Sequence, residues 1–170
     1  MNTFETIQKR RSIRKYKTKP VEPEKIQKLL EAARLGPSAA NRQPCHFIVV
    51  TDEKAKASLS EAYNQEWFLR APVIIVGCAD PEEAWGKRFG GEYWKVDAAI
   101  AMQNIVLTAT ELELGTCWIA AFKEKPVKKA LKIPNNVKVV AMTPVGYPDE
   151  RKEPATDRKP LSLIVHYNKW

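Results

Sequence analysis

Residues 96–119 read VDAAIAMQNIVLTATELELGTCWI, and this stretch decides the fold. Apolar residues surround nearly the whole circumference of a helix over Val96–Leu114, which is typical of a helix buried at the centre of a protein. Its acidic and amide side chains are costly in lipid, so the pattern predicts a core helix and not a membrane span. Gly115 ends the predicted helix, and a short strand, Thr116–Ile119, follows it.

The segments on either side alternate between helix and strand patterns. A first helix is predicted after Asn2, with Glu5 completing a capping box and Phe4 and Ile7 facing inward. Apolar residues three and four apart, or continuous apolar runs, predict further helices and strands. These are helices over residues 23–35, 52–63 and 124–132, and strands over residues 46–51, 73–78 and 137–145. This order predicts one domain, residues 1–170, with an α+β or α/β layer fold.

Charge is the most informative feature of the composition. The chain has 170 residues and a formal net charge of +8, and seven basic residues lie within Met1–Pro20 against one acid, Glu5. Such an excess predicts an anionic partner, which could be a phosphate-bearing cofactor, nucleic acid or an acidic membrane surface.

The cysteines and histidines predict neither a metal site nor an oxidising compartment. The three cysteines, Cys45, Cys78 and Cys117, match no zinc or CxxC spacing, so no metal is expected. An odd, sparse cysteine count is typical of a reducing compartment, and the N-terminus shows no signal peptide pattern. We therefore expect a cytoplasmic protein.

The sequence Arg10-Arg11-Ser12-Ile13-Arg14 is the first candidate binding motif. Guanidinium groups this close together repel one another unless an anion lies between them, and arginine donates forked hydrogen bonds to phosphate oxygens. A solvated basic turn and a nucleic-acid contact are the alternatives. No aromatic residues interleave with the arginines and no helix-turn-helix pattern follows, which argues against nucleic acid.

Three further segments are weaker candidates. The small residues of Gly36–Pro44 would let a flat ligand approach the backbone, although an ordinary capped turn explains them equally well. Gly115–Phe122 could offer backbone amides at a bend, with simple core packing as the alternative. Arg158-Lys159 is a second basic pair that could serve the same anion as the first motif.

Motifs that are absent narrow the function. The chain has neither a G-x-G-x-x-G nor a Walker A sequence, and no Ser/His/Asp set is apparent. A dinucleotide site of the Rossmann type and a P-loop are therefore disfavoured. Any redox chemistry must belong to a bound cofactor.

Taken together, these segments resemble the nitroreductase family of FMN enzymes. The matching motifs are R-R-S-I-R from Arg10, P-S-A-A-N-R-Q-P from Pro37, L-G-T-C-W-I from Leu114 and D-R-K-P-L from Asp157, in the order that the family has. The chain departs from the family in two places. Cys45 stands where tryptophan is usual, and Ala120 stands where short members often have glycine.

The resemblance implies a fold and a set of cofactor-binding residues. The fold would be α+β, with a mixed, largely antiparallel central sheet flanked by helices, in a three-layer homodimer centred on Val96–Leu114. FMN would lie at the subunit interface, with a C-terminal segment reaching over the partner. The implied binding residues are Arg10, Ser12 and Arg158 at the phosphate with Arg11 nearby, Arg14 at the ribityl chain or pyrimidine edge, Gln43 at the pyrimidine edge, Pro37, Ser38, Ala39 and Asn41 from the other subunit, and Ala120 at flavin N5 with Ala121 packed beside it.

The resemblance also implies the reaction. NADH or NADPH would give hydride to flavin N5, and a nitroaromatic, quinone or flavin-type acceptor would then take it in ping-pong fashion. No side chain is expected to act as a catalytic acid. A specialised relative that cleaves flavin or dehalogenates is one alternative, and a basic nucleic-acid-binding protein is another. Aromatic residues that could line the acceptor pocket, or simply belong to the core or interface, are Trp67, Phe68, Trp85, Phe89, Tyr93 and Trp94.

Overall fold

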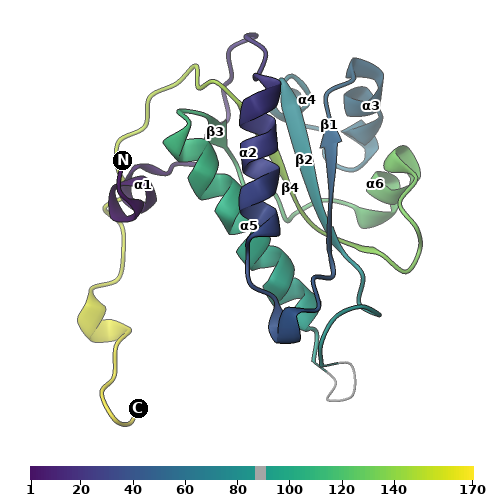
Figure 1. The fold of residues 1–170 in the computed structure, drawn as a ribbon. Helices are drawn as coiled ribbons and strands as arrows, with labels where there is room; N and C mark the ends of the chain where they lie inside the picture. Colours follow the sequence, from purple (N-terminus) through teal and green to yellow (C-terminus); the bar gives the residue numbers. More distant parts are fainter. Residues whose placement is uncertain (87–90) are drawn as a thin grey trace.

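The protein consists of three layers, a four-stranded sheet with helices on both faces (Figure 1). The computed structural model describes residues 1–86 and 91–170. The strand order is β1-β2-β4-β3, and each neighbouring pair is antiparallel. The strands are β1 (Cys45–Val50), β2 (Val73–Ala79), β3 (Gly115–Thr116) and β4 (Lys138–Gly146). The predicted α+β class with a largely antiparallel sheet is confirmed, and Ser12 adds a parallel bridge to Thr116.

The two faces of the sheet carry separate hydrophobic cores, because successive side chains of a strand point to opposite faces. In β2, Ile75 packs toward one core, while Ile74 and Val76 pack toward the other. A Cβ on Gly77 would lie 2.6 Å from the sulfur of Met102. Glycine at this position therefore lets the helix carrying Met102 lie close against the middle of the sheet.

The first helical layer consists of α2 (Pro23–Arg34) and α5 (Tyr93–Glu111). Helix α5 is the predicted central helix, but it begins and ends three residues earlier than predicted. Its buried face packs on the sheet and on α2, where Asn104 Nδ2 donates a 3.0 Å hydrogen bond to the carbonyl of Ala32. The opposite face is open, and Val96 is 49% exposed, so the helix is not buried all round within one chain.

The second helical layer covers the other face of the sheet. It contains α3 (Glu53–Ser58), a 3₁₀ turn over Leu59–Glu61, α4 (Glu66–Leu69) and α6 (Glu124–Leu131). The helix predicted over residues 52–63 thus ends early and tightens into the 3₁₀ turn. Within this layer the ammonium of Lys56 is buried and donates to the carbonyl of Ala71 at 2.9 Å.

Helix α1 (Thr3–Lys9) lies outside both cores. The predicted capping box between Asn2 and Glu5 is present. The prediction that Phe4 and Ile7 face inward is wrong, because they are 68% and 50% exposed. A seven-residue helix at the margin of the first layer offers these side chains no core within its own chain.

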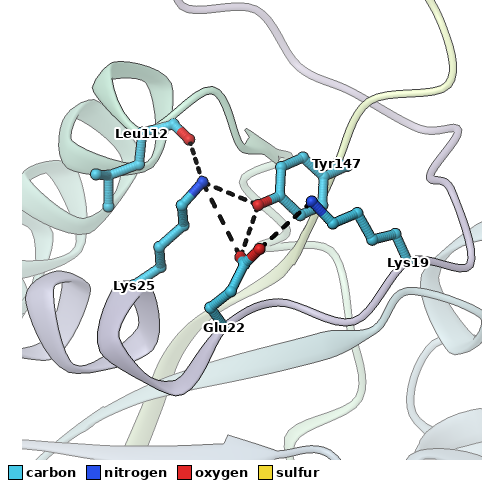
Figure 2. Close-up of polar contacts among 5 residues, drawn as sticks. All are labelled: Lys19, Glu22, Lys25, Leu112 and Tyr147. Carbon is cyan, nitrogen blue, oxygen red and sulfur yellow. Dashed lines mark hydrogen bonds and ion pairs between the residues drawn. The ribbon is translucent and has the colours of Figure 1, made fainter.

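A polar cluster fixes the corner where α2 begins and where α5 and β4 end (Figure 2). The hydroxyl of Tyr147 donates to Glu22 at 2.6 Å and accepts from Lys25 at 2.9 Å. Lys25 also donates to the carbonyl of Leu112 at 3.1 Å, and the ammonium of Lys19 lies 4.0 Å from the centre of the Tyr147 ring. The hydrogen bond from Tyr147 is the largest reason why the pKa of Glu22 falls to about 2.

Beyond β4 the chain continues as an extended tail that passes α1 and runs away from the three layers (Figure 1). Its last twenty residues include one short 3₁₀ turn, Leu161–Leu163. Large apolar side chains of the tail are exposed, namely Leu161, Leu163, Ile164, Val165, Tyr167 and Trp170. Across the described residues, no helix has both the length and the apolar character needed to cross a membrane.

Candidate functional site

The basic motif at the start of the chain lies against strand β3. Ser12 forms a parallel bridge with Thr116, and the amide of Ile13 donates to the carbonyl of Thr116 at 2.8 Å. A Cβ on Gly115 would lie 2.8 Å from the Ile13 side chain, so only glycine permits this approach. The structure therefore brings together two motifs that lie a hundred residues apart in the sequence.

The segment that follows β4 also forms hydrogen bonds with the backbone of the basic motif. Lys152 Nζ donates to the carbonyl of Ser12 at 2.7 Å, and the amide of Arg14 donates to Glu150 at 2.5 Å. Partial burial opposes ionisation of Glu150, but the hydrogen bonds from Arg14 and Lys152 outweigh it and lower the pKa of this carboxyl. The backbone of the motif is thus fixed from both sides.

The guanidinium groups of the motif are left without carboxylate partners. Arg10 and Arg11 are half-buried, and neither forms an ion pair with any residue that the structure describes. Arg11 lines a hollow of about 350 Å³, where the other charged residues are Lys9, Arg151 and Lys152 against Glu113 and Glu150. Basic side chains outnumber acidic ones around the hollow, and such an excess favours binding of an anion. This observation strengthens the anion-site interpretation over that of a solvated turn.

Arg14 points to a different surface from Arg11. Its guanidinium carbon lies 5.9 Å from the ring centre of Trp67 on α4, within the range of a cation–π contact. The two residues line a pocket of about 260 Å³ together with Tyr16 and Arg70. The hydroxyl of Tyr16 donates to the carbonyl of Ile13 at 2.6 Å, and burial is the main reason why its pKa rises far above its usual value.

Ala120 and Ala121 follow the strand region that continues from β3. Ile119 pairs with Met142 through two backbone hydrogen bonds of 2.9 and 3.0 Å, which fixes the chain just before these alanines. Both alanines are exposed, and their amides form no hydrogen bond with any residue in ranges 1–86 and 91–170. Two donors at a fixed bend are therefore free, and their assignment to a ligand atom stays a prediction.

The predicted loop Pro37–Pro44 has a strained backbone. Ala40, Asn41 and Gln43 have φ values of 50°, 52° and 54°, in the left-handed region that costs a non-glycine residue about 1–2 kcal/mol. The loop makes its own internal bond, in which the amide of Gln43 donates to Ser38 Oγ at 2.9 Å. Its amide at Ala39 donates to the carboxylate of Asp97 at 3.0 Å, which ties the loop to α5.

The loop and the basic motif lie at opposite ends of α5 (Figure 1). At 1.5 Å per residue, the 19 residues of this helix span about 28 Å. The loop contacts the start of the helix through Asp97, whereas Ile13 contacts Gly115, just beyond its end. One chain therefore does not bring all of the predicted site residues together.

Arg158 also lies apart from the motif that it was predicted to complete. It belongs to the exposed tail, and its guanidinium pairs with the neighbouring Asp157 at 3.0 Å. No hydrogen bond or ion pair among the described residues joins it to Arg10 or Ser12. Its assignment to the phosphate stays a prediction.

The candidate aromatic residues separate into different environments. Trp67 reaches the Arg14 pocket, whereas Phe68 is fully buried in the core of the second layer. The rings of Trp85 and Tyr93 pack edge to face at 4.9 Å near the start of α5, and Lys95 lies over Trp94. Phe89 lies outside the described residues.

Sequence reasoning missed Asp97 as a functional candidate and counted it only as a polar residue against a membrane span. It is 2% exposed, and its second oxygen, Oδ2, has no hydrogen-bond partner among the residues described. A carboxylate within an otherwise apolar helix was the available signal. Such a residue is seldom buried without a partner, because desolvation of its charge is costly.

The comparisons with known proteins agree with the fold and the motifs. The family model described as the nitroreductase family matches residues 7–63 and 57–147. A curated relative from Archaeoglobus fulgidus, named putative NADH dehydrogenase/NAD(P)H nitroreductase, is 38% identical and the match covers 96% of both chains.

Two solved structures give the same result. A nitroreductase family protein from Clostridium difficile superposes with a TM-score of 0.92 at 32% identity, covering 100% of both chains. An FMN-dependent nitroreductase from the same species gives a TM-score of 0.84 at 36% identity, covering 98% of this chain and 99% of the other. The family match and the named relatives place the protein in a class of oxidoreductases. The chain belongs to the nitroreductase family.

Proposed function

We propose that this protein is an FMN-dependent NAD(P)H oxidoreductase that works as a homodimer with its cofactor sites at the subunit interface. The observation that carries the proposal is the basic motif, in which half-buried Arg10 and Arg11 form no ion pair with any described residue although the motif's backbone is fixed by β3 and by the chain after β4. The FMN-dependent relative from Clostridium difficile, at 36% identity, supports the choice of cofactor.

The donor set fits the parts of FMN. Arg10, Arg11 and Ser12 would bind the phosphate, because charged, forked donors match phosphate oxygens. Arg14, held over Trp67, would place a positive charge beside the pyrimidine edge, where it favours electron uptake. The free amide of Ala120 would donate to N5, and its extra methyl relative to glycine leaves that donor in place.

Bound FMN would supply hydride transfer at N5, from NADH or NADPH to an acceptor such as a nitroaromatic, a quinone or another flavin. The protein would bind and orient the cofactor and supply positive charge near it. The relative from Archaeoglobus fulgidus is named for NADH dehydrogenase and NAD(P)H nitroreductase activity, which supports a nicotinamide donor.

The separation of the loop from the basic motif supports the dimer. Because α5 separates them by about 28 Å, the loop of one chain would cover the cofactor held by the motif of a second chain. The exposed apolar side chains of α5, α1 and the tail, including Val96, Phe4 and Leu163, also need a partner surface. Burial of such surface contributes about 25 cal/mol per Å².

The test is direct. The purified protein should be yellow, or should take up added FMN, and should sediment as a dimer. In anaerobic stopped-flow mixing, NADH or NADPH should bleach the flavin absorbance, and a nitroaromatic or quinone should restore it. A protein that binds no FMN would contradict the proposal. A flavin that neither donor bleaches would instead favour the specialised relative.

A further inference from the structure

The carboxylate of Asp97 joins the most apolar helix of the protein to its most strained loop. One oxygen accepts the amide of Ala39 at 3.0 Å, at the residue where the 3₁₀ turn of the loop begins. The side chain is almost wholly buried, at 2% exposure. Burying a charge in this position needs a compensating role, since an apolar residue would pack at lower cost.

The loop depends on few other attachments to the body of the protein. Most of its hydrogen bonds with described residues are internal, such as those from the amides of Asn41 and Gln43 to Ser38 at 2.9 Å each. At its far end the carbonyl of Pro44 accepts from the amide of Asp80 at 2.9 Å. The attachment to Asp97 therefore fixes the near end of a segment with three non-glycine residues at positive φ.

Asp97 also shares a pocket with the loop. Asp97 lines a pocket of about 200 Å³ with Ser38, Gln43 and Cys45 from the loop and the start of β1. Its second oxygen, Oδ2, is buried and has no hydrogen-bond partner among the described residues. Burial is the main reason why the pKa of Cys45 rises to about 11, and the charge of Asp97 contributes in the same direction.

We infer that Asp97 is a positioning residue, which holds the loop in its strained conformation before the cofactor arrives and thereby strengthens FMN binding. In this role it acts through its hydrogen bond to the Ala39 peptide. A loop ordered in advance loses less conformational freedom on binding, and affinity rises accordingly. The inference rests on the proposed function, because the loop would cover the flavin held by a second chain.

The test compares variants that separate the hydrogen bond from general stability. Asp97→Ala removes the acceptor, and Asp97→Asn keeps an acceptor oxygen while removing the charge. Glu124→Ala is the matched control, because Glu124 also accepts a backbone amide, that of Val139 at 3.1 Å, in the other helical layer. FMN affinity is measured by quenching of flavin fluorescence, and bound-flavin geometry by visible circular dichroism.

Asp97→Ala should weaken FMN binding roughly tenfold or more and change the flavin dichroism. Asp97→Asn should bind FMN with an affinity within about threefold of the parent, because its side-chain oxygen can still accept the hydrogen bond from the Ala39 amide. Glu124→Ala should leave affinity and dichroism unchanged even if it lowers the melting temperature. Equal FMN affinity for Asp97→Ala and Glu124→Ala would overturn the inference.

A second variant and a cofactor-free measurement keep the test decisive. Ala39→Pro deletes the donor from the other side of the bond, and Ser38 has φ and ψ of −129° and 153°, which suit a residue before proline. It should weaken FMN binding in the same direction as Asp97→Ala. In the apo-protein, hydrogen exchange at the Ala39 amide should be faster in Asp97→Ala. If the parent binds no FMN, the proposed function fails, while unchanged Ala39 exchange refutes the tether itself.

Discussion

The two ends of α5 differ in whether their polar groups find bonding partners within the same chain. At the start of the helix, the loop Pro37–Pro44 is strained, yet the chain supplies its bonds through Ser38 and Asp97. At the other end, the backbone of the basic motif is fixed, but the side chains of Arg10 and Arg11 form no ion pair with the residues described. The first end is thus held by bonds within the chain, whereas the proposed function assigns the free cations of the second end to an anion.

The largest expected effect comes from a charge on the face of α5 that would lie at the interface of the proposed dimer. Val96→Glu introduces a carboxylate on the open apolar face of α5, where the parent side chain is 49% exposed. We expect half the parent mass in sedimentation and loss of bound FMN, because burying an unpaired charge is very costly. Ser58→Glu, on the exposed surface of α3, is the control and should remain dimeric. A dimeric, yellow Val96→Glu protein would place the interface elsewhere.

Removing a charge from the basic motif should weaken the cofactor site without disturbing the fold. Arg10→Ala should raise the Kd of FMN by roughly tenfold to a hundredfold, since a charge-assisted hydrogen bond contributes about 1.5–3 kcal/mol. Lys54→Ala removes one exposed positive charge elsewhere and should leave the Kd unchanged. Arg158→Ala should act in the same direction as Arg10→Ala if the tail arginine reaches the phosphate. An unchanged Kd for Arg10→Ala would refute the phosphate assignment.

The loop at the start of α5 can be tested in the cofactor-free protein through the reactivity of the Cys45 thiol. Burial is the main reason why the pKa of this thiol rises to about 11, and the negative charge of Asp97 adds to it. Asp97→Asn removes that charge, so the pKa should fall and more thiolate should form at a given pH. Alkylation of Cys45 at mildly alkaline pH, followed by mass spectrometry, should become faster, and an unchanged rate would show that Asp97 has no effect on this thiol. Cys78, which is buried elsewhere, is the internal reference and should not change.

The smallest effect should come from the polar cluster that fixes the C-terminal end of α5. Tyr147→Phe removes the hydrogen bond to Glu22 and should lower the melting temperature by about 2–4 °C near neutral pH. The pKa of Glu22 is lowered from 4.5 to about 2, so the cluster stabilises the fold above the ordinary pKa and loses this effect as pH falls from about 4.5 to about 2. The difference between the parent and the variant should therefore shrink over that range. Lys54→Ala, at an exposed residue of α3, is the control and should not alter stability.

Most elements could be predicted because their signals are local. The Asn2 capping box, the Pro23 start of α2 and the apolar run of β2 each depend on residues close in sequence. The failures occurred where burial depends on distant segments. Phe4 and Ile7 have helical spacing but no neighbouring core, and this cannot be read from α1 alone.

The site motifs could be found from the sequence, but their spatial arrangement could not. The pairing of Ser12 with Thr116 joins segments about a hundred residues apart and depends on the close approach that Gly115 permits. The role of Asp97 was hidden for the same reason. Its partner, the amide of Ala39, lies 58 residues away in the chain.

The sequence by itself determined the helices, the strands and the chemical character of the site, because spacing, capping and charge act over a few residues. Only the tertiary structure decided which charges stay unpaired, which loop is strained and which carboxylate holds it. Those properties depend on long-range packing, which sets the distance between groups and their access to water. The placement of the loop and the basic motif at opposite ends of one helix is therefore a property of the fold alone.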